Sequence, residues 1–366
     1  MTHAEGRVVF NALRPSEDAD AVAAAIDRVV SSGWYILGPE VEAFEREFAA
    51  ASGAAHAVAV GNGTDAIALM LMALDIGEGD EVITAPLSAA FSALAIMMTG
   101  ARPVFADIDP ERLTLDPARV EAAIGPRTRA IMPVHLYGQA ADMRPLESIA
   151  NQRGLHLVED AAQAHLATCD GRPVGTIGMA GAFSFYPTKN LGALGDGGAV
   201  VTNDDSIAAR IKRLRNGGQT ARYQHAEAGV NSRLDELQAA ILRARLPYLP
   251  KWTARRRAVA GLYREGLAGG PVSVPPELDA GHVYHLFPVL TDRRTAFQAH
   301  LASQSIETLI HYPVPITRQR ALSRFGPAEC SVANRICDEI VSLPLYPGLS
   351  DHEVSRVIDG VRSFAR

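Results

Sequence analysis

Between residues 54 and 202, short apolar runs alternate with segments whose apolar residues recur at three-to-four spacing. This alternation is typical of repeated βαβ units around a mainly parallel sheet, because parallel strands need long, usually helical crossovers. Several runs are almost entirely apolar, as strands covered on both faces are. The expected strands span 57–60, 81–84, 103–106, 129–134, 155–159, 182–186 and 199–202. The sequence predicts an α/β protein with a mostly parallel seven-stranded sheet flanked by helices.

The same periodicity predicts crossover helices over 64–74, 88–99 and 143–153, the last with Asp142 as its N-cap. Further helices are expected over 204–214 and 233–246, and Pro247 and Pro250 are expected to end the second at a hinge or boundary. From about residue 251 an Arg-rich helix, a Gly/Pro-rich linker and short segments follow. We therefore expect an N-terminal segment (1–30) near the small domain, a large domain (31–247) and a smaller α+β C-terminal domain (248–366).

The composition is that of a globular protein, with 48% hydrophobic and 21% charged residues. A net charge of -6 without long basic runs offers no surface for nucleic acid. The three cysteines form neither a disulfide framework nor a metal pair, which favours a reducing compartment and no metal site. The sequence shows no signal-peptide core and no run of membrane-span length. We expect a cytoplasmic protein without membrane or nucleic-acid partners.

A glycine-rich turn, Gly61-Asn62-Gly63-Thr64-Asp65, lies between an expected strand and an expected helix. Glycines allow a tight turn, and free N–H groups at a helix start can face a phosphate. Thr64 adds a hydroxyl, whereas Asp65 is either a first-turn acid or a group near the ligand. Alone, this pattern suits any tight strand-to-helix junction slightly better than a phosphate site.

Two acids, Glu159 and Asp160, end another expected strand at the carboxyl edge, where open α/β sheets bind ligands. A buried carboxylate there can keep a cationic ring nitrogen protonated. The alternative is a helix N-cap for Ala161 and Ala162. The residues by themselves favour neither interpretation.

A single lysine, Lys189, stands in a polar turn after the aromatic strand that Pro187 breaks. Burial lowers the pKa of a lysine amine and makes the neutral, nucleophilic form more available. A surface lysine is the ordinary alternative. Four glycines follow, at 192, 195, 197 and 198, and they indicate backbone packed closely against a neighbour, which favours a functional lysine.

A phosphate turn, a carboxylate for a pyridine nitrogen and a lysine for an aldehyde are the three anchors of pyridoxal phosphate (PLP). Their order, with other segments between 32 and 347, resembles the DegT/DnrJ/EryC1/StrS family of PLP-dependent sugar aminotransferases. The matching segments are 32–39, 61–66, 133–138, 159–165, 184–189, 229–234 and 343–347. The resemblance implies fold type I of PLP-dependent enzymes, with PLP bound by the large domain.

By this resemblance, Lys189 forms the Schiff base and shuttles protons, and Asp160 pairs with the pyridine nitrogen. Gln163 contacts the ring hydroxyl. The phosphate contacts implied by the family are Gly63, Thr64 and Ser184. Relatives that act as sugar dehydratases carry His at the Lys189 position, so the resemblance favours transamination.

The resemblance also implies a homodimer with shared active sites, because Asn231 corresponds to an asparagine that reaches the phosphate of the neighbouring subunit's cofactor. A turn residue or helix cap is the alternative for Asn231. The family's aromatic residue over the PLP ring corresponds to Ala89 here. Either Phe91 takes its place or the stacking is lost, and Phe91 is otherwise a core residue.

The substrate implied by the resemblance is a nucleotide-linked keto sugar, with glutamate as the amino donor. The pattern is most like members that aminate the 3-keto position of dTDP-linked 6-deoxyhexoses, and a 4-keto sugar is the alternative. Family segments near the sugar correspond to Trp34, Tyr35, Tyr186, His311 and Tyr312. Two other classes remain as alternatives, a non-catalytic PLP-binding regulator and a nucleotide-binding dehydrogenase; the turn at Gly61 lacks the dehydrogenase's third glycine.

Overall fold

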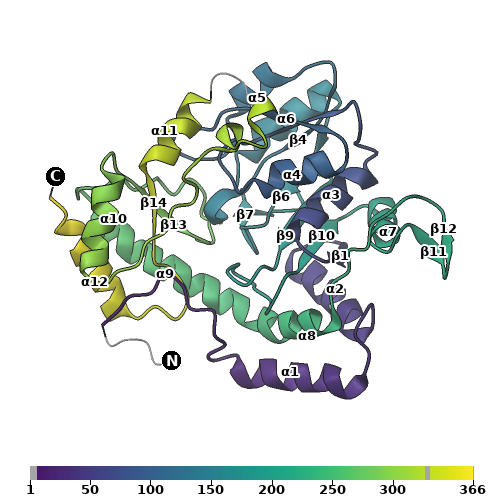
Figure 1. Cartoon of the computed structure of the whole chain (residues 1–366), viewed down its shortest axis with the longest axis horizontal. Helices are drawn as coiled ribbons and strands as arrows, with labels where there is room; N and C mark the ends of the chain where they lie inside the picture. Colours follow the sequence, from purple (N-terminus) through teal and green to yellow (C-terminus); the bar gives the residue numbers. More distant parts are fainter. Residues whose placement is uncertain (1–5, 326–329, 366) are drawn as a thin grey trace.

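A central sheet organises the larger part of the molecule (Figure 1). The computed structural model describes residues 6–325 and 330–365. The strands of the sheet are β1 (His56–Val60), β2 (Glu81–Thr84), β3 (Arg102–Phe105), β4 (Thr128–Met132), β5 (His156–Leu157), β6 (Glu159–Asp160), β9 (Ala180–Ser184) and β10 (Gly198–Thr202). Each lies within an apolar run expected from the sequence or overlaps one.

The strand order is β3-β2-β4-β5 in one half and β6-β9-β10-β1 in the other. Strands β5 and β6 continue one line, interrupted at Val158, whose N–H donates to Ile131 O at 3.1 Å. A parallel bridge between Val134 and Asp160 joins the halves. The described residues therefore form seven strand positions, in which β10 runs antiparallel to its two neighbours and the other pairings are parallel. The predicted fold class is confirmed.

Helices cover both faces of this sheet and bury apolar residues against it. They are α2 (Pro39–Ala51), α3 (Gly63–Ala73), α4 (Phe91–Met98), α5 (Pro117–Ala123), α6 (Met143–Arg153), α7 (Asp205–Leu214) and α8 (Glu236–Arg245). Helix α6 begins where expected, with Asp142 at its N-cap position, although the Asp142 side chain accepts no capping hydrogen bond. Short elements in the loops are η1 (Leu136–Gly138), β7 (Thr168–Cys169), β8 (Arg172–Pro173), β11 (Gln219–Ala221) and β12 (Gln224–His225).

The C-terminal part has a hydrophobic core of its own, which contains Tyr263, Phe287 and Phe297. Its elements are α9 (Leu249–Leu267), β13 (Phe287–Leu290), α10 (Arg294–Ser303), η3 (Ile316–Arg318), η4 (Ser323–Phe325), α11 (Ser331–Glu339), β14 (Ile340–Leu343) and α12 (Asp351–Arg362). Strands β13 and β14 pair antiparallel. In the described parts of the chain, no helix combines the length and the apolar character needed to cross a membrane.

Helix α8 ends at Arg245, just before Pro247, as expected from the sequence. Helix α8 passes through η2 (Leu246–Tyr248) directly into α9, with Pro247 and Pro250 in the first turns of η2 and α9. A proline in a first turn sacrifices no helical hydrogen bond, so η2 and α9 can each begin at these positions. The domain boundary proposed at 247/248 falls inside this run and stays a prediction.

The N-terminal segment divides between the two parts. Val8 forms a bridge to Ile306 and is buried in the C-terminal core. Helix α1 (Ala19–Ser32) instead lies along α8, where Ala25 and Val29 pack against Ala240. Glu17, just before α1, also contacts the C-terminal part, because its carboxylate accepts from Trp252 Nε1 of α9 at 2.8 Å.

Two sets of contacts place the C-terminal part over the carboxyl ends of the parallel strands. In the turn after β4, the carbonyls of Tyr137 and Gly138 accept hydrogen bonds from His285 N at 2.8 Å and Val283 N at 2.9 Å. Asp107, after β3, accepts from the N–H groups of residues 332 and 333 at the start of α11. The carboxyl edge of the sheet is thereby covered.

Candidate active site

The glycine-rich turn after β1 forms an anion seat at the start of α3. Asn62 caps the helix, because its Oδ1 accepts from Asp65 N at 2.9 Å. Within the described residues, the N–H groups of Gly63 and Thr64 have no acceptor. A Cβ at Gly63 would lie only 2.7 Å from Ser184 Cβ, so β9 approaches the turn closely. Gly63, Thr64 and Ser184 are thus together, as expected for a phosphate site.

Asp65 has a structural role in this turn. Its Oδ2 accepts from Ser232 Oγ at 2.6 Å and from Asn62 Nδ2 at 3.0 Å. Ser232 Oγ in turn accepts from Gly61 N at 3.0 Å. The turn is therefore tied to Ser232, the residue that follows Asn231. Asn231 itself is exposed.

Asp160 ends β6 with its carboxylate buried, at 3% exposure. Its Oδ2 accepts from Ser92 Oγ at 2.7 Å, and its Oδ1 accepts from Ala162 N at 3.1 Å. The contact from Ala162 N closes a turn; no helix follows Asp160 in the described stretch before β7, so the helix N-cap alternative was wrong. Because a carboxylate offers about four acceptor sites, two of them stay available for a ligand.

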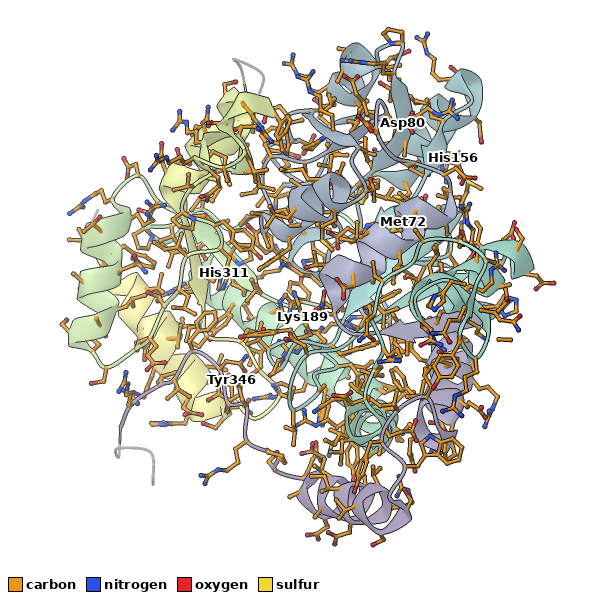
Figure 2. All side chains as sticks on the ribbon, turned by 45° about the vertical axis from the view of Figure 1, so that its right-hand side comes forward. Met72, Asp80, His156, Lys189, His311 and Tyr346 are labelled. Atoms are coloured by element: carbon orange, nitrogen blue, oxygen red, sulfur yellow. The ribbon has the colours of Figure 1, made fainter. Side chains whose placement is uncertain are left out.

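Lys189 lies in the loop after β9, near the middle of the molecule (Figure 2). Its backbone N–H donates to Tyr186 O at 2.8 Å, which fixes the turn. Desolvation by burial lowers the pKa of the Lys189 amine from its usual value to about 8, and the negative charge of Asp160 opposes this shift. A substantial fraction of the amine is therefore neutral near physiological pH, as a nucleophile or base requires.

Gln163 is buried beside Asp160 and links the sheet to the C-terminal part. Its Oε1 accepts from Tyr137 N at 2.8 Å, and its Nε2 donates to Tyr312 OH at 3.0 Å. Burial raises the pKa of Tyr312 to about 12, so the phenol keeps its proton. One amide hydrogen of Gln163 remains for a ligand, which suits the contact expected with a ring hydroxyl.

Two buried histidines, His165 and His285, and the half-buried His311 lie near the lysine. Burial first, and the charge of Lys189 second, lower the pKa of His311 to about 4, that of His165 to about 3, and that of His285 well below its usual value. His285 Nδ1 also lies 3.2 Å from Asn190 Oδ1. All three rings are neutral at pH 7, and sequence reasoning identified only His311.

The other expected substrate residues lie on the surface. Trp34, Tyr35 and Tyr186 are 56%, 48% and 51% exposed. Glu236 holds the loop before α2, because its carboxylate accepts from Gly38 N, Glu40 N and Val41 N. The substrate role of Trp34, Tyr35 and Tyr186 stays a prediction. Phe91 is 61% exposed at the start of α4, so it is not a core residue, and Ala89 is partly buried.

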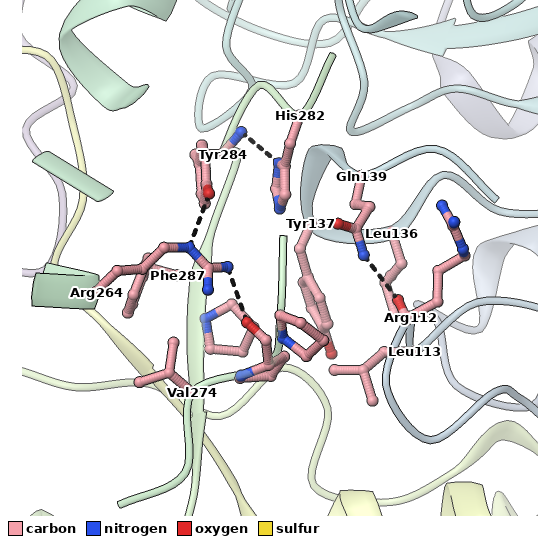
Figure 3. Close-up of a pocket in the computed structure, with 13 residues that line it drawn as sticks. Arg112, Leu113, Leu136, Tyr137, Gln139, Arg264, Val274, His282, Tyr284 and Phe287 are labelled. Carbon is pink, nitrogen blue, oxygen red and sulfur yellow. Dashed lines mark hydrogen bonds between the residues drawn. The ribbon is translucent and has the colours of Figure 1, made fainter. Parts of the chain in front are cut away.

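A separate cavity of about 20 Å³ lies between Tyr137 and residues of the C-terminal part, such as Arg264 and Tyr284 (Figure 3). His282 and Tyr284 stack along it with ring centroids 3.8 Å apart. Neither Lys189 nor Asp160 lines it. Its volume suits about one water molecule, so it is not a substrate site.

Comparison with known proteins identifies the family. A model of the DegT/DnrJ/EryC1/StrS aminotransferase family matches residues 16–362. The chain belongs to this family. The dTDP-3-amino-3,4,6-trideoxy-alpha-D-glucose transaminase of Streptomyces venezuelae is 48% identical to this aminotransferase over 363 residues, which cover 98% of this chain and 94% of that protein.

Two solved structures support the assignment. S. venezuelae DesV, in complex with a ketimine intermediate, matches with a TM-score of 0.95 and 48% identity over 98% of this chain and 100% of that one. NtdA from Bacillus subtilis, with bound cofactor PMP, matches with a TM-score of 0.91 and 29% identity over 98% and 85% of the two chains. This aminotransferase is a PLP-dependent enzyme.

The residues of the site fit that cofactor. The unpaired N–H groups of Gly63 and Thr64 suit a phosphate, the free acceptor sites of Asp160 suit a protonated ring nitrogen, and the amine of Lys189 suits an aldehyde. Within the described residues, no group of three or more His, Cys, Asp or Glu side chains is arranged for a metal ion.

Proposed function

We propose that this aminotransferase moves an amino group from glutamate to the 3-keto group of a dTDP-linked 6-deoxyhexose. The transamination chemistry is supported by one observation, the half-buried Lys189, whose amine has a lowered pKa and senses the charge of the buried Asp160 carboxylate. The substrate class is supported by the printed name of the S. venezuelae relative, a dTDP-3-amino sugar transaminase that is 48% identical.

The proposed roles follow from the site's geometry. PLP, when bound, supplies the aldehyde that accepts the amino group and the electron-poor ring that stabilises charge on the reacting carbon. Asp160 holds a proton at the ring nitrogen, and the N–H groups of Gly63 and Thr64 bind the phosphate. Nζ of Lys189 would remove the proton from the donor's α carbon and hold it for return during the same half-reaction.

The neutral state of the neighbouring histidines supports this role for Lys189. Because His165, His285 and His311 carry no charge at pH 7, none of them provides a competing strong acid beside the amine. His311 Nδ1 lies 3.0 Å from Ser342 Oγ, and its ring contacts the ring of Tyr312. We propose that His311 and Tyr312 border the sugar.

We propose that two copies of the chain share their active sites. Asn231 is exposed although it adjoins the phosphate turn through Ser232, so its side chain is available to a second subunit. The exposed aromatic residues Trp34, Tyr35 and Tyr186 would be covered in such a dimer. The three cysteines are buried and unpaired, which suits the reducing cytoplasm that we propose as the location.

The deciding experiment offers PLP, glutamate and a panel of 3-keto and 4-keto nucleotide sugars, and locates the new amine by NMR. We expect amination at C3 of a dTDP sugar. Amination at C4 would contradict the 3-keto assignment, and product without glutamate consumption would contradict the donor.

A second test is the variant Lys189→Ala, which removes the proposed base. Turnover should fall by about 10⁴-fold, the upper range for a general acid–base group, while PLP still binds without a covalent link. Normal turnover by this variant would remove Lys189 from its role.

A further inference from the structure

A buried pair of serine hydroxyls lies behind Asp160, on the loop and helix that follow β2. Ser92, in the first turn of α4, is 2% exposed and places its Oγ 2.7 Å from Asp160 Oδ2. Ser88 is 5% exposed, and its Oγ lies 3.3 Å from Ser92 Oγ. The sequence showed nothing beyond helix periodicity at these positions.

The direction of these hydrogen bonds follows from the chemistry of the groups. A carboxylate only accepts, so Ser92 donates its single proton to Asp160. Ser92 Oγ can then only accept from Ser88, which makes Ser88 the donor of the second bond. Both hydroxyls therefore point toward Asp160, and each bond polarises the next.

The Ser92 bond constrains the carboxylate in two ways. With Ala162 N on Oδ1 and Ser92 Oγ on Oδ2, each oxygen has one protein donor, so the carboxyl plane cannot rotate without losing a bond. A hydrogen bond to a charged group also stabilises that charge in a buried site. The remaining acceptor sites are thus directed toward a ligand.

We infer that Ser92 is a positioning residue, which orients the Asp160 carboxylate and stabilises its charge so that it holds the proton on the cofactor's ring nitrogen. Ser88 supports Ser92 in this role. This inference rests on the role proposed above for Asp160, and it adds a residue that acts on the cofactor only through that carboxylate.

The test measures the pH midpoint at which the visible absorbance of the PLP-loaded enzyme changes, which reports protonation of the Lys189 nitrogen. A proton held on the ring nitrogen disfavours a second proton nearby, because like charges repel. Ser92→Ala weakens the hold on the first proton, so the midpoint should rise by about one pH unit. PLP should also dissociate about tenfold more readily, measured by equilibrium dialysis.

Companion variants separate this role from a loss of packing. Ser92→Thr keeps a hydroxyl and should restore the midpoint, whereas Ser88→Ala should shift it less than Ser92→Ala. Thr84→Val is the matched control, because Thr84 is fully buried on β2 and its hydroxyl bonds Met132 O at 2.9 Å, away from Asp160. Thr84→Val should leave the midpoint unchanged.

Two outcomes would overturn the inference: an unchanged midpoint in Ser92→Ala, or an equal shift in Thr84→Val. If Ser92→Ala does not fold, Ser92→Cys carries the test, because a thiol of similar size is a weak donor and should shift the midpoint in the same direction. Asp160→Asn separates a failure of the Ser92 inference from a failure of the role proposed for Asp160. A shift in Asp160→Asn without one in Ser92→Ala rejects Ser92 alone, and no shift in either rejects the role of Asp160.

Discussion

Two adjacent acids on β6, Glu159 and Asp160, occupy opposite faces of the strand and differ in how completely they are bonded. Glu159 is fully buried and accepts four hydrogen bonds, from His135 Nε2, Gly175 N, Ile177 N and Gly178 N, at 2.7 to 2.9 Å. Asp160 accepts two. Strand alternation alone sends neighbouring side chains to opposite faces.

The difference shows what distinguishes a structural acid from a functional one. The environment of Glu159 uses its full acceptor capacity, and His135 is held in the matching orientation because its Nδ1 accepts from Ala141 N at 3.0 Å. Asp160 faces the covered edge of the sheet with capacity left and with Lys189 nearby. A buried carboxylate with unused acceptor sites at a ligand-binding edge is the one expected to do chemistry.

The largest expected effect tests the functional acid. Asp160→Asn removes the charge that holds the ring-nitrogen proton, and kcat should fall by about 10²- to 10³-fold. The free energy of unfolding of the cofactor-free chain should change little, because the amide has the same shape as the carboxylate. Its oxygen can accept from Ala162 N, and its NH₂ group can donate to Ser92 Oγ once the Ser92 hydroxyl turns away. Steady-state kinetics and urea unfolding measure the two quantities. Near-normal kcat would place Asp160 with the structural acids.

Glu159→Gln tests the opposite case. Either orientation of the new amide turns its NH₂ group toward two donors, the Gly175 and His135 groups or the Ile177 and Gly178 groups. Stability should fall by about 3 kcal/mol, the cost of leaving buried donors unpaired. Urea unfolding measures this loss, and the folded fraction should keep most of its kcat. A stable Glu159→Gln protein without activity would reverse the assignment.

The smallest effect concerns the charge coupling between Asp160 and Lys189. Only the neutral amine attacks an aldehyde, so the rate of PLP capture should rise with pH and level off above the lysine's pKa of about 8. Because the charge of Asp160 raises that pKa, Asp160→Asn should move the midpoint below 8. Stopped-flow absorbance after mixing with PLP measures both midpoints. A wild-type midpoint near 10, that of an exposed lysine, would show that the amine is not desolvated.

Much of the sheet could be predicted because its signals are local. Each expected strand overlaps an observed one, and glycine turns and terminal acids follow strands whose carboxyl ends meet at one edge. Gly63 therefore lies against Ser184, and Lys189 lies close enough to Asp160 to sense its charge. The helix predicted over 233–246 ends at Arg245, close to its predicted end, and the hinge expected at Pro247 stays a prediction.

By itself, the sequence determined the fold class and the strand ends that carry Asp160 and Lys189, because strand and helix periods act over a few residues. Only the tertiary structure decided that Glu159 has all its acceptor sites filled, that Ser92 donates to Asp160 and that neutral histidines lie near Lys189. These depend on contacts between segments separated by tens of residues or more, where hydrogen-bond partners and desolvation are set by how the layers pack.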